Sequence, residues 1–209
     1  MTLKEYHRKR RFGVTPEPIG RVKRRSRRCI FVVQKHNASR LHYDFRVAMS
    51  GLLVSWALPK GPSMNPADKR LAIRTEDHPL EYAKFEGVIP AGQYGAGTVM
   101  VWDLGPYGSK DGPPGEQLAR GKMDVNLQGT KLRGGFTLIQ TGIRPSNSSQ
   151  KQRWMLIKQR DEYADASWNI ENPRFDDSVL TGRSLKEIEE NGPNRKSRRG
   201  KVLARTRAA

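Results

Sequence analysis

Residues 41–47 read Leu41-His42-Tyr43-Asp44-Phe45-Arg46-Val47, and apolar and polar residues alternate along them without exception. Successive side chains of a β-strand point to opposite faces, so this alternation predicts a strand with one face in the core. His42, Asp44 and Arg46 then share the other face. An imidazole and a carboxylate can bind a divalent cation, and a guanidinium fits phosphoryl oxygens. From this strand alone, a solvated face with Asp44 in an ion pair is the alternative.

Apolar runs separated by turns continue the pattern on both sides of this stretch. The further expected strands are Ile30–Gln34, Leu52–Leu58, Leu71–Arg74, Gly97–Trp102, Met123–Leu127, Gly135–Ile139 and Trp154–Lys158. Many short strands with turn residues between them are typical of all-β domains. We therefore predict a mainly β fold, a small antiparallel β-barrel with little helix, in which Trp56, Trp102, Trp154 and Phe136 belong to the core.

The net charge of +18 is concentrated at the two ends of the chain. Residues 1–28 hold eleven Lys and Arg against Glu5 and Glu17, and residues 191–209 hold seven with no acid. We predict a basic N-terminal arm over 1–28, a folded domain over 29–165, a linker-like segment over 166–190 and a basic tail over 191–209. Ser184 and Glu187 have the spacing of a capping box, which predicts one short helix in the linker-like segment. Both ends are expected to be disordered and to contact nucleic acid, although a localisation signal, ribosome contact or plain solvation would give the same charge.

Cys29 is the one cysteine, which excludes a disulfide within the chain and fits a reducing compartment. The first residues carry charge without a following apolar run, so they do not resemble a secretory signal. No stretch reaches the length of a membrane span. We expect a soluble, cytoplasmic protein with no membrane partner, associated with the nucleoid in a bacterium or archaeon.

Two further histidines lie near carboxylates or near the alternating strand. His36 precedes that strand, and the polar Asn37-Ala38-Ser39 between them predicts a turn, so we expect His36 on a loop. His78 follows Glu76 and Asp77, and the Pro79 after it favours an extended conformation. These residues strengthen the hypothesis of a site for a cation and a phosphate.

The run Phe31-Val32-Val33-Gln34-Lys35-His36-Asn37-Ala38-Ser39-Arg40-Leu41-His42-Tyr43-Asp44-Phe45-Arg46 resembles the signature of the 3′-phosphoesterase domain found at the start of bacterial DNA ligase D. Five further motifs follow in that family's order: Ser55–Ser63, Glu76–Tyr82, Phe85–Pro90, Tyr94–Val99 and Trp154–Tyr163. The resemblance implies a β-barrel enzyme that uses Mn²⁺ or a similar cation. Such an enzyme removes a 3′-terminal ribonucleoside and then the 3′-phosphate from DNA, leaving a 3′-OH for end repair.

The resemblance also implies roles for single residues. The metal ligands it implies are His36, Asp44 and His78. The residues it implies at the scissile phosphate are His42, a candidate general acid, and Arg46. The further active-site positions it implies are Lys60, Arg70, Glu76 and Tyr82, of which Lys60 and Arg70 could neutralise phosphate charge.

The chain departs from the family pattern in two respects. Ala91 and Gln93 stand in the loop where family members often carry an acid and another polar or charged residue, a difference that concerns the contacts of the loop and not the metal site. No Lys-x-Asp-Gly motif for nucleotidyl transfer occurs, so we expect a DNA ligase or end-joining partner to act in trans on the same DNA 3′ ends, such as primer–template ends.

Two other functions compete with this interpretation. The order His42-x-Asp44 with a later His78 has the form of the iron triad of 2-oxoglutarate oxygenases, but no arginine follows closely to hold the cosubstrate carboxylate. A non-catalytic DNA-end-binding protein would use the basic ends alone. Such a protein would need no histidines and carboxylate in register, and its folded body would be more basic. The interpretation of Tyr94, as a packing residue or as a platform for a base, stays open.

Overall fold

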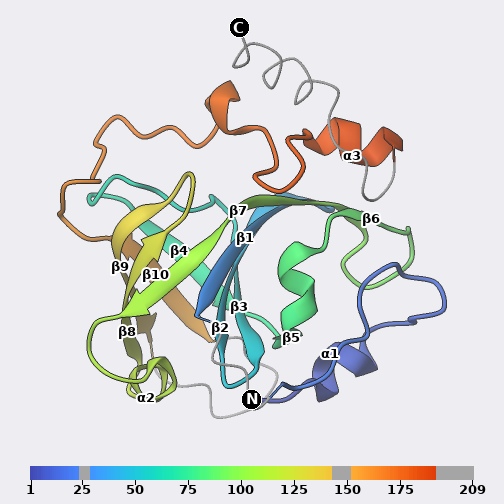
Figure 1. Ribbon diagram of the computed structural model, residues 1–209, viewed down its shortest axis with the longest axis horizontal. Coiled ribbons are helices and arrows are strands. Elements are labelled where there is room, and N and C mark those ends of the chain that lie inside the picture. The colour runs from blue at the N-terminus through green and yellow to red at the C-terminus, as the bar shows by residue number, and fades with distance from the viewer. Residues whose placement is uncertain (24–28, 143–151, 192–209) are drawn as a thin grey trace, which may run out of the picture.

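The computed structural model describes residues 1–23, 29–142 and 152–191 (Figure 1). Within them, eight antiparallel strands close into a barrel in the order β1-β2-β3-β4-β10-β9-β8-β7, and β7 pairs back with β1. The strands are β1 (Ile30–Asn37), β2 (Leu41–Met49), β3 (Leu52–Leu58), β4 (Lys69–Arg74), β7 (Gly97–Ser109), β8 (Lys122–Gln128), β9 (Arg133–Thr141) and β10 (Arg153–Lys158). Each contains one of the strands expected from the sequence, so the predicted β-barrel is confirmed.

Short elements decorate the barrel. They are α1 (Lys4–Arg8), β5 (His78–Pro79), η1 (Leu80–Lys84), β6 (Gly87–Ile89), α2 (Pro114–Ala119), η2 (Pro173–Phe175) and α3 (Leu185–Asn191). The predicted capping box starts α3, because Glu187 Oε2 accepts from the Ser184 backbone N–H at 3.0 Å and Ser184 Oγ accepts from that of Glu187 at 3.3 Å. None of the helices in the described ranges is long and apolar enough to cross a membrane.

The inside of the barrel is filled by large side chains. Trp56, Trp102 and Phe136 are fully buried and Trp154 is 2% exposed, as predicted. The rings of Trp56 and Trp154 meet edge to face, with centroids 6.0 Å apart. Burying such surfaces supplies most of the driving force for closing a small barrel.

The β1–β2 hairpin sets the position of the polar face. His36 pairs directly with His42 and Gln34 with Asp44, so these side chains stand side by side on one face of the sheet. The expectation that His36 lies on a loop was wrong, because β1 continues to Asn37 and the turn begins only at Ala38. The polar residues that predicted the break form the end of the strand and the turn.

The N-terminal segment, defined here as residues 1–23, differs from the predicted arm. Leu3 is 4% exposed and Tyr6 is fully buried, and both pack in an apolar cluster on the outer side of the barrel. Figure 1 shows α1 against the lower right of the barrel. Two apolar anchors among many charges leave no periodicity in the sequence, yet they fix the segment to the domain. The predicted tail residues 192–209 and the basic run 24–28 lie outside the described residues.

The C-terminal segment, defined here as residues 166–191, packs on the domain as well. Ile188 of α3 is fully buried, and Trp168, Ile170, Phe175 and Leu185 pack against the barrel core. Figure 1 shows this segment crossing the top of the barrel, away from α1. The residues expected to form a linker therefore contribute to the folded body.

Candidate active site

A cleft of about 490 Å³ opens over the polar face of the β1–β2 hairpin. One wall is the hairpin turn at Ser39 and Arg40, and the opposite wall holds Tyr94 and Gly95 of the β6–β7 loop. The N-terminal segment supplies Arg10 to the lining. The polar face predicted from the sequence thus forms the floor of a cleft that three separate parts of the chain enclose.

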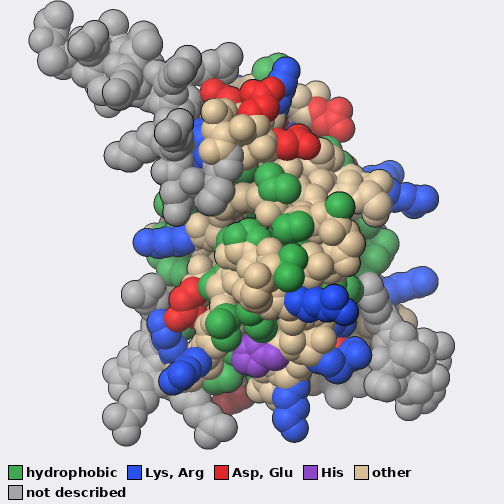
Figure 2. Space-filling view, turned by 90° about the vertical axis from the view of Figure 1, so that its right-hand side faces the viewer, with side chains coloured by type: hydrophobic (Ala, Val, Ile, Leu, Met, Phe, Trp, Pro, Cys, Tyr) green, Lys and Arg blue, Asp and Glu red, His purple; other side chains and the backbone are tan. Residues whose placement is uncertain are grey.

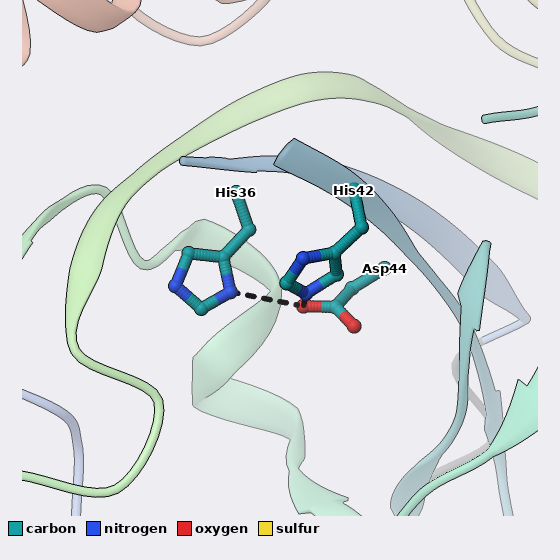
Figure 3. A group of neighbouring side chains, drawn as sticks. All are labelled: His36, His42 and Asp44. Atoms are coloured by element: carbon teal, nitrogen blue, oxygen red, sulfur yellow. Dashed lines mark ion pairs between the residues drawn. The ribbon is translucent and has the colours of Figure 1, made fainter. Parts of the chain in front are cut away.

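His36, His42 and Asp44 form a cluster on this floor, and their ligand atoms all lie within 4.8 Å of one another. Asp44 Oδ2 is 3.7 Å from His36 Nδ1 and 3.8 Å from His42 Nε2. Figure 3 shows the two rings side by side, both directed toward the carboxylate. The cluster is mostly buried, since the Asp44 side chain is 10% exposed and that of His36 is 8% exposed.

The outer nitrogens of both rings contact backbone carbonyls. His36 Nε2 donates to Gly95 O at 3.0 Å, and His42 Nδ1 donates to Arg40 O at 2.9 Å. A carbonyl oxygen only accepts, so these contacts assign the protons of the neutral rings to the outer nitrogens. The inner nitrogens then point lone pairs at Asp44. Metal-binding histidines are held in this way, and two imidazoles with a carboxylate suit a borderline divalent cation.

The electrostatics keep Asp44 ionised. Burial alone would raise the pKa of this carboxyl, but the Arg46 guanidinium, 3.1 Å away, holds it below its usual value. Arg46 is itself fixed, because its Nε donates to Gln34 Oε1 at 2.8 Å and its guanidinium lies 4.9 Å from the Tyr82 ring centroid. Gln34 is fully buried and was missed in the sequence analysis, although its place two residues before His36 puts it on the same face.

His78 lies between two guanidinium groups. Arg46 Nη1 is 2.9 Å from its Nδ1, and Arg10 Nη2 is 3.1 Å from its Nε2. Burial lowers the pKa of His78 well below its ordinary value and both arginines lower it further, so the ring is neutral near pH 7. A neutral imidazole accepts at one nitrogen only, whereas guanidinium groups only donate. At least one of the two arginines therefore points an N–H at this ring without finding an acceptor there.

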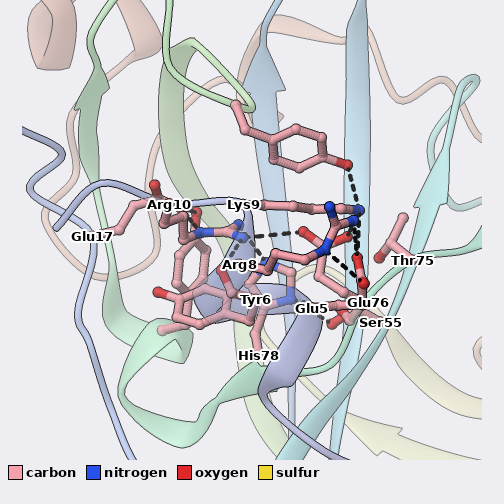
Figure 4. Close-up of polar contacts among 12 residues, drawn as sticks. Glu5, Tyr6, Arg8, Lys9, Arg10, Glu17, Ser55, Thr75, Glu76 and His78 are labelled. Atoms are coloured by element: carbon pink, nitrogen blue, oxygen red, sulfur yellow. Dashed lines mark hydrogen bonds and ion pairs between the residues drawn. The ribbon is translucent and has the colours of Figure 1, made fainter.

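Arg10 reaches this position through the N-terminal segment. Its guanidinium pairs with Glu17 at 2.8 Å and with Glu76 at 3.2 Å, and it lies 3.9 Å from the centroid of the Tyr6 ring. Figure 4 shows these groups gathered around His78. Arg10 had no signal in the sequence beyond being one of many basic residues, because its partners are distant along the chain.

The residues named from the sequence fall into three groups. His36, His42 and Asp44 form the cluster, and Arg46, Glu76, His78 and Tyr82 line the same cleft. Lys60 and Arg70 are not among the lining residues: Lys60 is exposed at the end of β3, and Arg70 pairs with Asp68 at 2.7 Å. The structure thus gathers seven of the nine, and it places His42 rather than His78 beside His36 and Asp44.

Fold and site together define a small β-barrel with a candidate cation cluster next to the guanidinium groups of Arg10 and Arg46. The sequence model of the family described as DNA Ligase D 3′-phosphoesterase domain matches residues 34–140. The chain belongs to this family.

Relatives extend the match beyond the barrel. The multifunctional non-homologous end joining protein LigD of Pseudomonas aeruginosa is 49% identical over 191 residues, which are 88% of this chain and 22% of that protein. The LigD of Mycobacterium tuberculosis is 48% identical over 143 residues, 66% of this chain and 18% of that protein. That of Mycolicibacterium smegmatis is 38% identical over 166 residues, 77% and 21% respectively. The chain spans about a fifth of the length of these relatives.

Proposed function

We propose that this chain is a phosphoesterase of DNA 3′ ends that depends on Mn²⁺ or a similar divalent cation. It removes a 3′-terminal ribonucleoside and then the remaining 3′-phosphate, leaving a 3′-OH. Its substrates are the primer–template ends met in end joining, and a DNA ligase seals the product. The family and the names of the relatives support this context.

The observation that carries the proposal is the meeting of two donor sets in one cleft. Two histidine lone pairs and the Asp44 carboxylate converge where a cation fits, and the cation would supply positive charge that polarises a phosphoryl oxygen. In the same cleft, Arg46 and Arg10 direct N–H groups toward the two ring nitrogens of His78. Cationic sites next to guanidinium donors stabilise the charge that develops during phosphoryl transfer.

In this proposal the metal ligands are His36, His42 and Asp44. The His42 nitrogen that faces the cluster cannot both bind a cation and hold a proton, so the role of general acid does not accompany the role of ligand. His78, neutral and packed against Arg46, positions that guanidinium toward a phosphate oxygen. Glu76 pairs with the Arg10 guanidinium, and the Tyr82 ring lies against the Arg46 guanidinium. These two residues hold the arginines in place.

A primer–template with a 5′ label and one 3′-terminal ribonucleotide tests the activity. We expect shortened product with Mn²⁺ and none in a chelator. Asp44→Asn, which keeps the shape of the side chain, should abolish trimming. Asp124→Asn is the matched control, because Asp124 is a buried carboxylate outside the cleft lining and is held by Lys122 at 2.9 Å. Trimming by the Asp44 variant at the wild-type rate would contradict the proposal.

Mn²⁺ titration of three histidine variants tests the ligand set. His36→Ala and His42→Ala should both bind Mn²⁺ more weakly, and excess Mn²⁺ should partly restore trimming in each. His7→Ala is the control, because His7 Nε2 also faces a backbone carbonyl, at 3.0 Å, but is exposed on α1. If the His42 variant binds Mn²⁺ normally and trims slowly at every Mn²⁺ concentration, His42 is the general acid and not a metal ligand.

A further inference from the structure

Tyr94 stands at the rim of the cleft with 46% of its surface exposed. It belongs to neither of the hydrophobic clusters that fill the barrel and cover its outer side. Tyrosine buries a large apolar area when it can, so a tyrosine left half in solvent beside a site is available to a ligand.

The loop that carries Tyr94 is fixed to the cluster of His36, His42 and Asp44. The next residue, Gly95, accepts the hydrogen bond from His36 Nε2. Gly95 has φ +76°, a left-handed conformation that glycine adopts without strain, and a Cβ at this position would lie 3.9 Å from the His36 ring. The Tyr94 ring is therefore held one residue away from the hydrogen bond that orients a candidate ligand.

Two cations of the N-terminal segment lie beside the ring. Lys9 Nζ is 4.5 Å from the ring centroid and 3.2 Å from the hydroxyl, and the Arg10 guanidinium carbon is 5.8 Å from the centroid. Lys9 also contacts Glu76 at 3.1 Å, which ties this corner to the floor of the cleft. Figure 2 shows the face that carries α1, with Lys and Arg side chains around a histidine. An exposed aromatic ring flanked by cations is the arrangement with which proteins bind single-stranded nucleic acid, the ring stacking on a base and the cations meeting the backbone.

We infer that Tyr94 stacks on the base of the nucleotide whose 3′ oxygen carries the scissile phosphate. This inference rests on the proposed function, because in that function one cleft binds two kinds of DNA 3′ end. An end with a terminal ribonucleoside has nucleosides on both sides of the phosphate, whereas a 3′-phosphate end has one, on the 5′ side. A ring that serves both ends must therefore bind the nucleoside that is retained.

Fluorescence of 2-aminopurine tests the stacking without any chemistry. The base is placed at the last nucleotide of a primer that ends in a 3′-phosphate, and binding to the full chain is followed in a chelator. We expect quenching by the wild-type protein and by Tyr94→Phe, which keeps the ring and loses the hydroxyl contact to Lys9. Tyr94→Ala should lose the quenching. Tyr163→Ala is the matched control, because Tyr163 is 44% exposed and is not part of the cleft lining.

Steady-state kinetics give a second readout. Tyr94→Ala should raise KM about 5- to 150-fold, the range of base–aromatic stacking, and should do so for both kinds of end. Tyr94→Phe should stay within about twofold of wild type. Unchanged quenching and KM in Tyr94→Ala would overturn the inference, and so would a defect confined to ends with a terminal ribonucleoside. If the wild-type protein does not trim at all, the proposed function fails and the fluorescence experiment alone decides on Tyr94.

Discussion

The N-terminal and C-terminal segments both pack on the barrel, yet they bury their charges in different places. The N-terminal segment brings Arg10 into the cleft, between Glu17, Glu76 and His78. The C-terminal segment brings Arg183 to Glu86, at 3.5 Å, and neither residue lines the cleft. Buried ion pairs stabilise a fold little because of their desolvation cost. We infer from this difference that the buried contacts of Arg10 serve the chemistry of the cleft. The Arg183–Glu86 pair fixes the C-terminal segment to the barrel.

The two buried arginines give the sharpest test of this comparison. Arg10→Met and Arg183→Met should each cost about 3–5 kcal/mol of stability, because each leaves a buried carboxylate without its partner. The Arg10 variant should also lose about 10²- to 10³-fold in kcat, the effect of removing one donor to a charged transition state. The Arg183 variant should keep its kcat per folded molecule. Denaturant unfolding and trimming rates, both measured at low temperature where the variants remain folded, give the two quantities.

An equal loss of kcat in the two variants would remove the distinction between the segments. Arg10→Lys is a useful companion, because it keeps the charge but not the planar group that reaches three partners. We expect it to recover more stability than activity.

The apolar anchors of the segments form the next pair. Leu3→Ala and Ile188→Ala remove buried side chains and should cost about 2–5 kcal/mol each if the site remains packed. Leu3 anchors the N-terminal segment to the outer apolar cluster, so its loss should appear as local opening of that segment. Turnover should then fall in the Leu3 variant only, and hydrogen exchange should be faster in α1. A loss of turnover with Ile188→Ala of the same size would contradict the comparison.

The helix cap of the C-terminal segment should have a smaller effect. Ser184→Ala removes the side-chain acceptor for the Glu187 N–H and should cost about 1 kcal/mol. Lys186→Ala, on the exposed surface of the same helix, is the control and should change stability by a few tenths of a kcal/mol. Trimming should be unaffected by both, which urea unfolding and the primer assay would check.

The last prediction concerns pH. Lys131 Nζ donates to the carbonyls of Phe175 and Asp177 in the C-terminal segment, and burial lowers the pKa of this amine to about 8. The unfolded chain keeps the ordinary lysine value, so between pH 8 and about 10.4 it binds more protons than the native state. Relative to Lys131→Met, the wild-type protein should therefore gain stability as pH rises through this range, by at most about 1.4 kcal/mol per pH unit. A relative loss over the same range would show that the amine is not desolvated.

The barrel and the floor of the site could be predicted from the sequence because both depend on local alternation. Period-two patterning places His42, Asp44 and Arg46 on one face whatever the rest of the chain does. The partner of that face is equally local, since His36 lies one short turn away. The extent of β1 was missed because Asn37 is polar, and a strand end is decided by pairing with β2 and β7 rather than by its own residues.

The other half of the site could not be predicted, because its contacts join distant parts of the chain. Arg10 meets Glu76, and Tyr82 donates its hydroxyl hydrogen bond to Glu17 at 2.9 Å. Nothing in a run of basic residues distinguishes the one that will be buried. Resemblance to a family supplied residue identities but no distances, so Lys60 and Arg70 stay predictions outside the described cleft lining, and Gln34 was missed.

The hairpin that joins β1 to β2 has a consequence for how the protein folds. All three cluster residues lie within nine positions of sequence, from His36 to Asp44, so the loop closed on assembling them is among the cheapest in entropy. A slip of one position would turn one strand's ligands to the opposite face of the sheet. A bound cation would thus favour the native pairing over its shifted alternatives while most of the barrel is still open. The cation would then select the correct register of β1 and β2 during refolding, before the protein can bind a substrate.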